Sequence, residues 1–507
     1  MDYEPVIGLE IHLQLATASK MFCSCPNPSA SLRAGFLGRD DIAPNNLVCP
    51  VCLGQPGTLP TLNSQAVTLG LKLVLALDAE LNHTSAFDRK NYTYPDLTKG
   101  YQITQFYTPL AQHGRLIYLF EGQKKALRLH ELHLEEDTGK TTHAGQSSLV
   151  DYNRAGVPLV ELVFEPDLHT PAEAKAAVEE LRLLARTLGV SDADMEKGHL
   201  RCDANVSVRP VGSIELGVKV EVKNLNSLRS IQRALEYEVQ RQTKLWQEDT
   251  PPSDSETRGW DERQQITLPQ RSKEGRHDYR YFPEPDLPPL VVQFDELELL
   301  RGLLPVLPQA RRELLQAEYG LSSSAVCLLV ERGFDDYLGQ VISEGREWVT
   351  STIEEGTVAE KWQIWGAKFT KAALNWLDEM FKHLETIPNG HRPTPENFAE
   401  FLTYILERKV NSTAAQTLLK RMVESGGDPS QILADGDLLQ VSDKGQLTAI
   451  VEQVIAENPS AVADIKAGKQ NALKYLVGAA MKASKGKADP EAVRKLIDDR
   501  LSLFNQK

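Results

Sequence analysis

Apolar and polar residues alternate in short runs through residues 1–290, between turn signals rich in Gly, Pro and Asn. In the run 8–15 every odd-numbered residue is apolar, whereas Glu10, His12 and Gln14 occupy even positions. Because successive side chains of a strand point to opposite faces, this run predicts a strand with one buried and one polar face.

Helical spacing appears between these runs and dominates the rest of the chain. Thr170 and Pro171 are typical of the cap and first turn of a helix, which we expect over 171–188. Another helix is expected over 69–82. Far along the chain, Asn411 stands as a cap before a further helical pattern.

A chain of 507 residues is too long for one hydrophobic core, so we expect about two to four domains. The change of pattern predicts an α+β protein of three parts. Residues 1–290 are expected to form the strand-rich domain, 291–404 a helical linker domain, and 405–507 a helical tail domain.

The net charge of the chain is negative, but the charged residues are distributed unevenly along it. Fifty-six Lys and Arg against seventy Asp and Glu give −14, which argues against a protein that coats nucleic acid without specificity. The tail 405–507 carries fifteen basic and thirteen acidic residues, a net charge of +2. We therefore expect a polyanion to bind to the tail rather than to the rest of the chain. No stretch resembles a membrane span or an export signal, and we expect a cytoplasmic protein.

Three more runs place polar side chains on strand faces, at 132–137, 201–209 and 218–223. Each alone fits an ordinary solvated face, but four such strands favour the floor of an open pocket. Carboxylates there would hold Mg²⁺, while Lys and Arg would contact phosphate oxygens. The candidates on these runs are Glu10, His12, Glu135, Glu136, Arg201, Asp203, Lys219, Glu221 and Lys223.

Two stretches, 88–96 and 278–286, are basic, aromatic and turn-prone. Such residues grip phosphates or stack on a base, although a loop packed by its own tyrosines explains them equally well. Nucleotide signatures such as a P-loop or a G-x-G-x-x-G turn are missing, so any ATP must bind on a sheet surface.

Four of the six cysteines fall in two close pairs, Cys23 with Cys25 and Cys49 with Cys52. Two such pairs can supply the four soft ligands of a tetrahedral zinc site, which would be structural because no coordination position stays open. The alternative is four unligated surface thiols. This knuckle would be an insertion at about 20–55 of the first domain.

Several segments carry a family resemblance. They are Val6–His12, Phe87–Tyr92, Leu132–Asp137, Leu149–Arg154, Leu200–Ser207, Val220–Ser227, Asp278–Leu287 and Met481–Gly486. In this order the chain resembles the B-subunit family of the tRNA-dependent amidotransferases along nearly its whole length. The cysteine quartet is similar to that of the zinc-binding members.

The resemblance implies an enzyme subunit that amidates mischarged Glu-tRNA(Gln), Asp-tRNA(Asn) or both. In that family ATP phosphorylates the side-chain carboxylate, and ammonia then displaces phosphate. The implied partners are an amidase A subunit that supplies ammonia, a small C subunit, the mischarged tRNA and a non-discriminating aminoacyl-tRNA synthetase. The implied fold is an antiparallel cradle like that of glutamine synthetase, followed by a helical domain and a tRNA-binding tail.

With this resemblance we assign roles to the candidate residues. Glu10, His12, Glu136 and Glu221 lead as Mg²⁺ ligands, followed by Glu135, Asp151 and Asp203. Lys90, Tyr92 and Lys99 are expected along the ammonia route or at the phosphorylated intermediate. ATP contacts are expected from Arg201, Lys219, Lys223 and Arg280, and tRNA contacts in the tail from Lys482, Lys485 and Lys487.

Two other classes of protein stay open. A zinc-ribbon scaffold that binds RNA would not turn over ATP, and a stand-alone ligase for a small acid would do so without tRNA.

Overall fold

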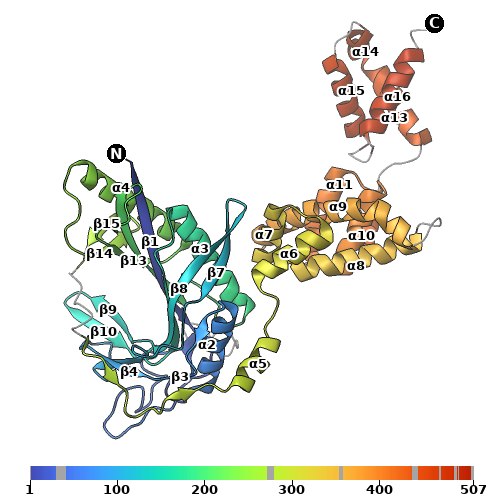
Figure 1. The fold of residues 1–507 in the computed structure, drawn as a ribbon. Coiled ribbons are helices and arrows are strands. Elements are labelled where there is room, and N and C mark those ends of the chain that lie inside the picture. The colour runs from blue at the N-terminus through green and yellow to red at the C-terminus, as the bar shows by residue number, and fades with distance from the viewer. Residues whose placement is uncertain are drawn as a thin grey trace. The chain divides into compact units, whose positions relative to one another are not determined.

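The computed structural model describes residues 2–29, 42–270, 279–352, 358–436, 444–466, 470–484, 488 and 490–503. It contains two compact units, Met1–Glu313 and Leu314–Lys507. The first unit is a strand-rich domain with helices, and the regular elements among the described residues of the second are all helices (Figure 1). The predicted α+β class is therefore confirmed.

A ten-stranded sheet organises the first unit, in the order β15-β14-β13-β12-β1-β11-β8-β6-β2, with β7 paired to β8. Its strands are β1 Tyr3–Gln14, β2 Glu80–Leu81, β6 Ala111–Gln112, β7 Arg115–Phe120, β8 Gln123–Glu136, β11 Pro158–Phe164, β12 Leu200–Pro210, β13 Val220–Leu225, β14 Glu256–Asp261 and β15 Ile266–Pro269. Small sheets pair β9 Lys140–Ala144 with β10 Ser147–Asp151, β3 Thr84–Ser85 with β17 Leu290–Val291, and β4 Asp88–Asn91 with both β5 Tyr101–Thr104 and β16 Phe282–Pro283.

The large sheet is mixed, whereas a wholly antiparallel sheet was expected. All its pairs are antiparallel except β13 and β14, which run parallel. Helix α4 (Leu228–Gln247) lies between these two strands in the sequence. A helical crossover of this length returns the chain to the same end of the sheet, so the next strand runs parallel.

Helices cover one face of this sheet and leave the polar face of β1 on the other side. The apolar residues of β1, Ile7 to Leu13 at odd positions, are buried in one core with residues of α2 (Ser64–Ala76), α3 (Pro171–Thr187) and α4. Figure 1 shows α3 and α4 alongside the strands. The alternation of β1 thus decides which of its residues are available to a site.

Capping residues set the helix starts. Thr170 accepts a hydrogen bond from the amide of Glu173, with Pro171 in the first turn, so the predicted start of α3 is confirmed. Helix α2 begins at Ser64 and not near 69, because Asn63 accepts hydrogen bonds from two amides of its first turn.

The second unit holds two hydrophobic cores, one over Leu329–Leu433 and one over Leu447–Leu501. The boundary expected at 404 lies inside the first of them, within α10. The remaining helices are α5 Phe294–Gly302, α6 Pro308–Tyr319, α7 Ser323–Arg332, α8 Asp335–Thr352, α9 Val358–Thr386, α10 Pro395–Leu406, α11 Ser412–Ser425, α12 Pro429–Gly436, α13 Lys444–Glu457, α14 Pro459–Lys466, α15 Gln470–Ala483 and α16 Pro490–Leu503. Among the described helices, none combines the length and the apolar character that crossing a membrane requires.

Candidate functional site

The polar face of the central sheet gathers acidic and imidazole side chains from three adjacent strands. His12 of β1 lies opposite Glu161 of β11, and Glu161 lies opposite His133 of β8. Ligand atoms of Glu10, His12 and Glu161 all lie within 4.8 Å of one another. We call Glu10, His12, His133, Glu135 and Glu161 the sheet-face cluster.

Ion pairs hold this cluster together. Nε2 of His12 lies 3.5 Å from carboxylate oxygens of both Glu135 and Glu161, and Nε2 of His133 lies 3.0 Å from Glu161. Burial alone would lower the pKa of each histidine, but Glu161 and then Glu135 raise both pKa values to about 9. Burial and the charge of Glu161 raise the pKa of Glu135.

Cations border the cluster on two sides. Lys90 of β4 lies 5.0 Å from the ring centre of Tyr279; burial alone would lower its pKa, but the charge of Glu135 raises it. On the other side, Nζ of Lys223 lies 2.7 Å from Asp203 and 3.4 Å from Glu221. Carboxylates able to hold a hard cation and ammonium groups able to contact phosphate are thus neighbours.

Arg201 faces the same side of the sheet from β12, opposite His12. Its guanidinium donates to Asp137 at 2.9 Å. Burial would raise the pKa of Asp137, but Arg201 and Arg154 hold it below its usual value. Arg201 therefore stands beside the cluster with part of its hydrogen-bonding capacity already used.

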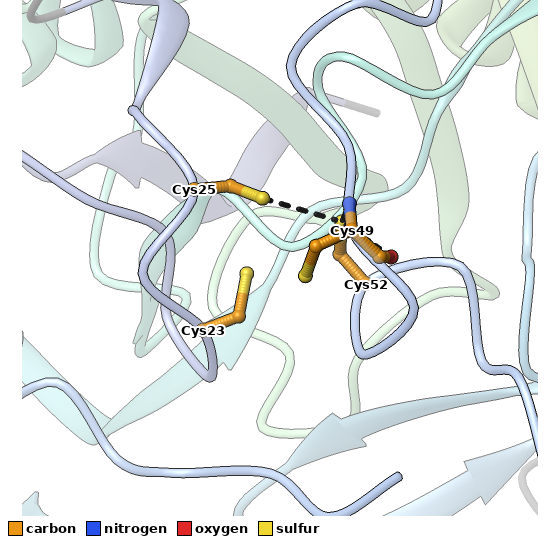
Figure 2. A group of neighbouring side chains, drawn as sticks. All are labelled: Cys23, Cys25, Cys49 and Cys52. Carbon is orange, nitrogen blue, oxygen red and sulfur yellow. Dashed lines mark hydrogen bonds between the residues drawn. The ribbon is translucent and has the colours of Figure 1, made fainter.

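The four paired cysteines form a second candidate site, which we call the cysteine cluster (Figure 2). Figure 2 shows Cys23 and Cys25 on one loop facing Cys49 and Cys52 on another, and their sulfurs all lie within 4.8 Å of one another. A tetrahedral zinc site with Zn–S bonds of about 2.3 Å separates its sulfurs by about 3.8 Å. The sulfurs of Cys25 and Cys52 are 4.0 Å apart, which fits such a site.

The charge state of Cys52 also fits metal binding. A hydrogen bond from Cys23, another from the amide of Cys49, and the nearby charge of Lys20 lower its pKa to about 4. Burial raises the pKa of Cys25 to about 11. Zinc binds thiolates, so a cluster that already stabilises one is prepared for the ion. All four thiols are free of disulfides.

Comparisons with known proteins identify the chain. The GatB/GatE catalytic domain matches residues 5–298, and the GatB domain matches residues 347–501. A relative from Carboxydothermus hydrogenoformans, named as the B subunit of aspartyl/glutamyl-tRNA(Asn/Gln) amidotransferase, is 43% identical, with 99% of each chain covered. A relative of the same name from Moorella thermoacetica is 44% identical over 99% of this chain and 100% of its own.

The chain belongs to the amidotransferase B-subunit family. The resemblance drawn from the sequence is thereby confirmed. The catalytic-domain match covers both the sheet-face cluster and the cysteine cluster, since both lie within residues 5–298.

Several predicted residues lie apart from the sheet-face cluster of this family member. Glu136 follows Glu135 directly on β8, so its side chain points to the other face, where it pairs with Lys99 and accepts a hydrogen bond from the amide of Ile103. Glu136 is therefore not grouped with the Mg²⁺ candidates of the sheet face. It lines a pocket of about 120 Å³ together with Lys99 and Cys52.

Asp151 and Arg280 also have local surroundings of their own. Asp151 accepts hydrogen bonds from the amides of Asn45 and Asn153, which is typical of a residue that shapes a turn. Arg280 has a positive φ of 44° and an exposed side chain, and its carbonyl accepts a hydrogen bond from Asn91. Tyr92 contacts Tyr279 in an edge-to-face arrangement with ring centres 5.8 Å apart.

A cavity of about 780 Å³ opens on the polar side of β1 and β12. Lys219, Asn205, Ser207, Gly8 and Phe164 are among its lining residues. Asn205 and Ser207 follow Asp203 at the same strand parity, so the cavity and the sheet-face cluster share one face of the sheet.

Glu161 and His133 were missed in the sequence. Glu161 is the one charged residue of β11, whose other residues are apolar or proline. A lone acid within an apolar strand was the available signal, since a buried carboxylate requires a partner. His133 stood next to the predicted acids, but its position opposite Glu161 depends on the order of the strands.

Proposed function

We propose that this chain amidates the side-chain carboxylate of mischarged Glu-tRNA(Gln), Asp-tRNA(Asn) or both, in an ATP-dependent reaction. The names of its relatives support the substrate. The single observation that carries the chemistry is the sheet-face cluster, where Glu10, His12 and Glu161 converge between cationic side chains. Such an arrangement is suited to phosphoryl transfer, which depends on positioning and on neutralising phosphate charge.

The proposed reaction has two steps. A carboxylate oxygen of the aminoacyl group attacks the γ-phosphorus of ATP, so that ADP leaves and an acyl phosphate forms. Ammonia then attacks the acyl carbon, phosphate leaves, and the nitrogen loses a proton to give the amide. Activation is needed because a free carboxylate is a poor acceptor of nucleophiles.

The sheet-face residues divide this work. Glu10, His12 and Glu161, with Glu135 close to His12, would hold Mg²⁺, which supplies charge neutralisation for the transferred phosphoryl group. Lys223, which pairs with Asp203, and Lys90, which lies near the charge of Glu135, would contact phosphate oxygens from the two sides of the cluster. Asp203 and Glu221 both contact Lys223 and so orient its ammonium group.

The nucleoside of ATP would bind in the cavity beside Asn205 and Lys219. Its volume of about 780 Å³ lies within the usual range for small-molecule sites. A triphosphate extending from this cavity along the sheet face would reach Lys223. Arg201 would contact the substrate from the neighbouring strand.

Ammonia would enter through the pocket of Glu136 and Lys99. This pair sits next to Ile103 and Tyr101 and lines a space of about 120 Å³. A polar lining can hold ammonia by hydrogen bonds while keeping the route narrow. Tyr92 and Lys90 would line the end of the ammonia route, next to the sheet-face cluster.

The cysteine cluster would hold a structural Zn²⁺ through Cys23, Cys25, Cys49 and Cys52. The first unit would form a cradle like that of glutamine synthetase. Its partners would be an A subunit that supplies ammonia and a small C subunit. The tail would bind tRNA. Lys482 lies in the last turn of α15, whereas Lys485 and Lys487 lie outside the described residues.

The test is ADP release by this chain, co-purified with its A and C subunits, with and without Glu-tRNA(Gln). We expect release that requires the charged tRNA and that fails in Glu10→Gln. A matched control is Glu179→Gln, an exposed residue of α3 on the helical side. ATP turnover indifferent to tRNA would indicate a small-acid ligase, and no turnover in an intact complex that binds tRNA would indicate a scaffold.

A further inference from the structure

Lys20 is a fully buried lysine whose ammonium group points at the cysteine cluster. Its exposed fraction is 0%. Nζ donates to Sγ of Cys52 at 3.6 Å and to the carbonyl of Tyr152 at 3.3 Å. Within the described part of the chain, Lys20 forms no ion pair with a carboxylate.

A buried ammonium group is stable only beside a negative partner. The carbonyl of Tyr152 offers a dipole, and the sulfur of Cys52 is the group in contact that can carry a full charge. Four thiolates around Zn²⁺ would leave a net charge of −2 in a largely buried place. One ammonium group beside them reduces this charge to −1.

The backbone around Lys20 links the same parts. Its amide donates to the carbonyl of Cys25 at 2.9 Å, and the next amide, of Met21, donates to Gly156 at 2.7 Å. Gly156 has a φ of +84°, and a side chain added there would lie 3.5 Å from Lys20 and 3.6 Å from Cys52. Lys20 therefore lies between both cysteine pairs and the turn that follows Tyr152.

We propose that Lys20 is a positioning residue of the zinc site. Its ammonium group neutralises part of the thiolate charge, donates an N–H···S hydrogen bond to Cys52, and ties the cysteine cluster to the turn at Tyr152. Groups that hydrogen-bond to metal ligands set ligand orientation and metal affinity. This proposal rests on the proposed zinc site.

The experiment uses the full chain with three substitutions at this position. Lys20→Met removes charge and hydrogen bonds, Lys20→Gln keeps a donor without charge, and Lys20→Arg keeps the charge. Lys72→Met, at a half-buried lysine of helix α2, is the matched control. Zinc content, the rate of zinc transfer to a chromogenic chelator, and the thiolate-to-metal charge-transfer band of the Co²⁺ form are measured.

We expect one zinc per wild-type chain, and transfer about 10- to 100-fold faster in Lys20→Met and Lys20→Gln. Lys20→Arg should restore slow transfer, and Lys72→Met should match the wild type. Without the ammonium group the thiolates are stronger donors, so the Co²⁺ band should move to lower energy. This shift would not follow from a general loss of stability.

An unchanged rate of zinc transfer from the zinc-loaded Lys20→Gln chain, together with an unchanged band in its Co²⁺ form, would overturn the role of Lys20 and leave the zinc site intact. A wild-type chain that binds no zinc would overturn both proposals. If Lys20→Met does not fold, the comparison of Lys20→Gln with Lys20→Arg still separates charge from packing.

Discussion

The cysteine cluster and the sheet-face cluster both lie in the first unit but are built differently. The first takes four sulfurs from two loops, with hydrogen bonds among its own members, such as the amide of Cys49 to Cys52 at 3.2 Å. The second takes carboxylates and imidazoles from paired strands and surrounds them with cations from β4, β12 and β13.

In our proposal this difference separates a site for a permanently bound ion from a site for transient ligands. Four sulfurs at tetrahedral spacing complete the coordination of one ion and leave no position for a substrate. In the sheet-face cluster acids already have cationic or imidazole partners, such as His12 for Glu161. In our proposal a hard cation would replace these partners beside the acids, and incoming phosphates would pair with the cations set free, so the site would be stable before and after its ligands bind.

Removing Mg²⁺ should have the largest effect. We expect tRNA-dependent ADP release to stop after EDTA treatment and to return when Mg²⁺ is added, because in our proposal the sheet-face oxygens hold a hard cation reversibly. Zinc content measured in the same sample should stay constant. Loss of zinc together with activity that Mg²⁺ does not restore would contradict the division between the two sites.

Glu161→Gln should have the second-largest effect and should lower the rate of ADP release by about 100- to 1,000-fold. The substitution removes one charge that contacts both His12 and His133. Steady-state ADP release, with zinc content as the internal check, measures the effect, and Glu179→Gln is the control. A rate within about tenfold of the wild type would remove Glu161 from the catalytic set.

Cys49→Ser should mainly affect stability. We expect zinc content near zero and a melting temperature lower by roughly 10 °C. The variant would lose about 3 kcal/mol of metal-linked stability, and each kcal/mol lowers the melting temperature by some 2–4 °C. Cys327→Ser on α7 gives a matched control outside the cluster. A zinc-free variant with an unchanged melting temperature would show that the cluster does not support the fold.

Lys99→Met should have the smallest effect and should slow only the second step, the attack of ammonia on the acyl phosphate. Because Lys99 pairs with Glu136 away from the sheet-face cluster, ADP release should stay within about twofold, while glutamine-dependent amidation falls about tenfold. Amide formation with added ammonium salt should recover. An equal decrease in both steps would place Lys99 in carboxylate activation instead.

Much of the candidate chemistry was predictable because it depends on local patterns. The alternation of β1 identified Glu10 and His12 as polar neighbours, and the spacing of the cysteines identified their cluster. Two adjacent acids on a strand had to face opposite sides, which limited Glu135 and Glu136 to one member per site.

Only the tertiary structure decided which member that was. Glu135 faces His12 because of the register of β8 against β11, and Glu161 joins because β11 lies between β1 and β8. Lys20 gained its significance in the same way, since Cys52 and Tyr152 are distant in sequence.

The sequence by itself determined the family, the two-residue period of the strands and the residues each strand could offer. Strand order, register and the meeting of loops came from the packing of one large core, because contacts between distant segments depend on how all the apolar faces are buried together. Which face of a strand a side chain occupies depends on the local sequence, whereas its neighbours on adjacent strands depend on the whole fold.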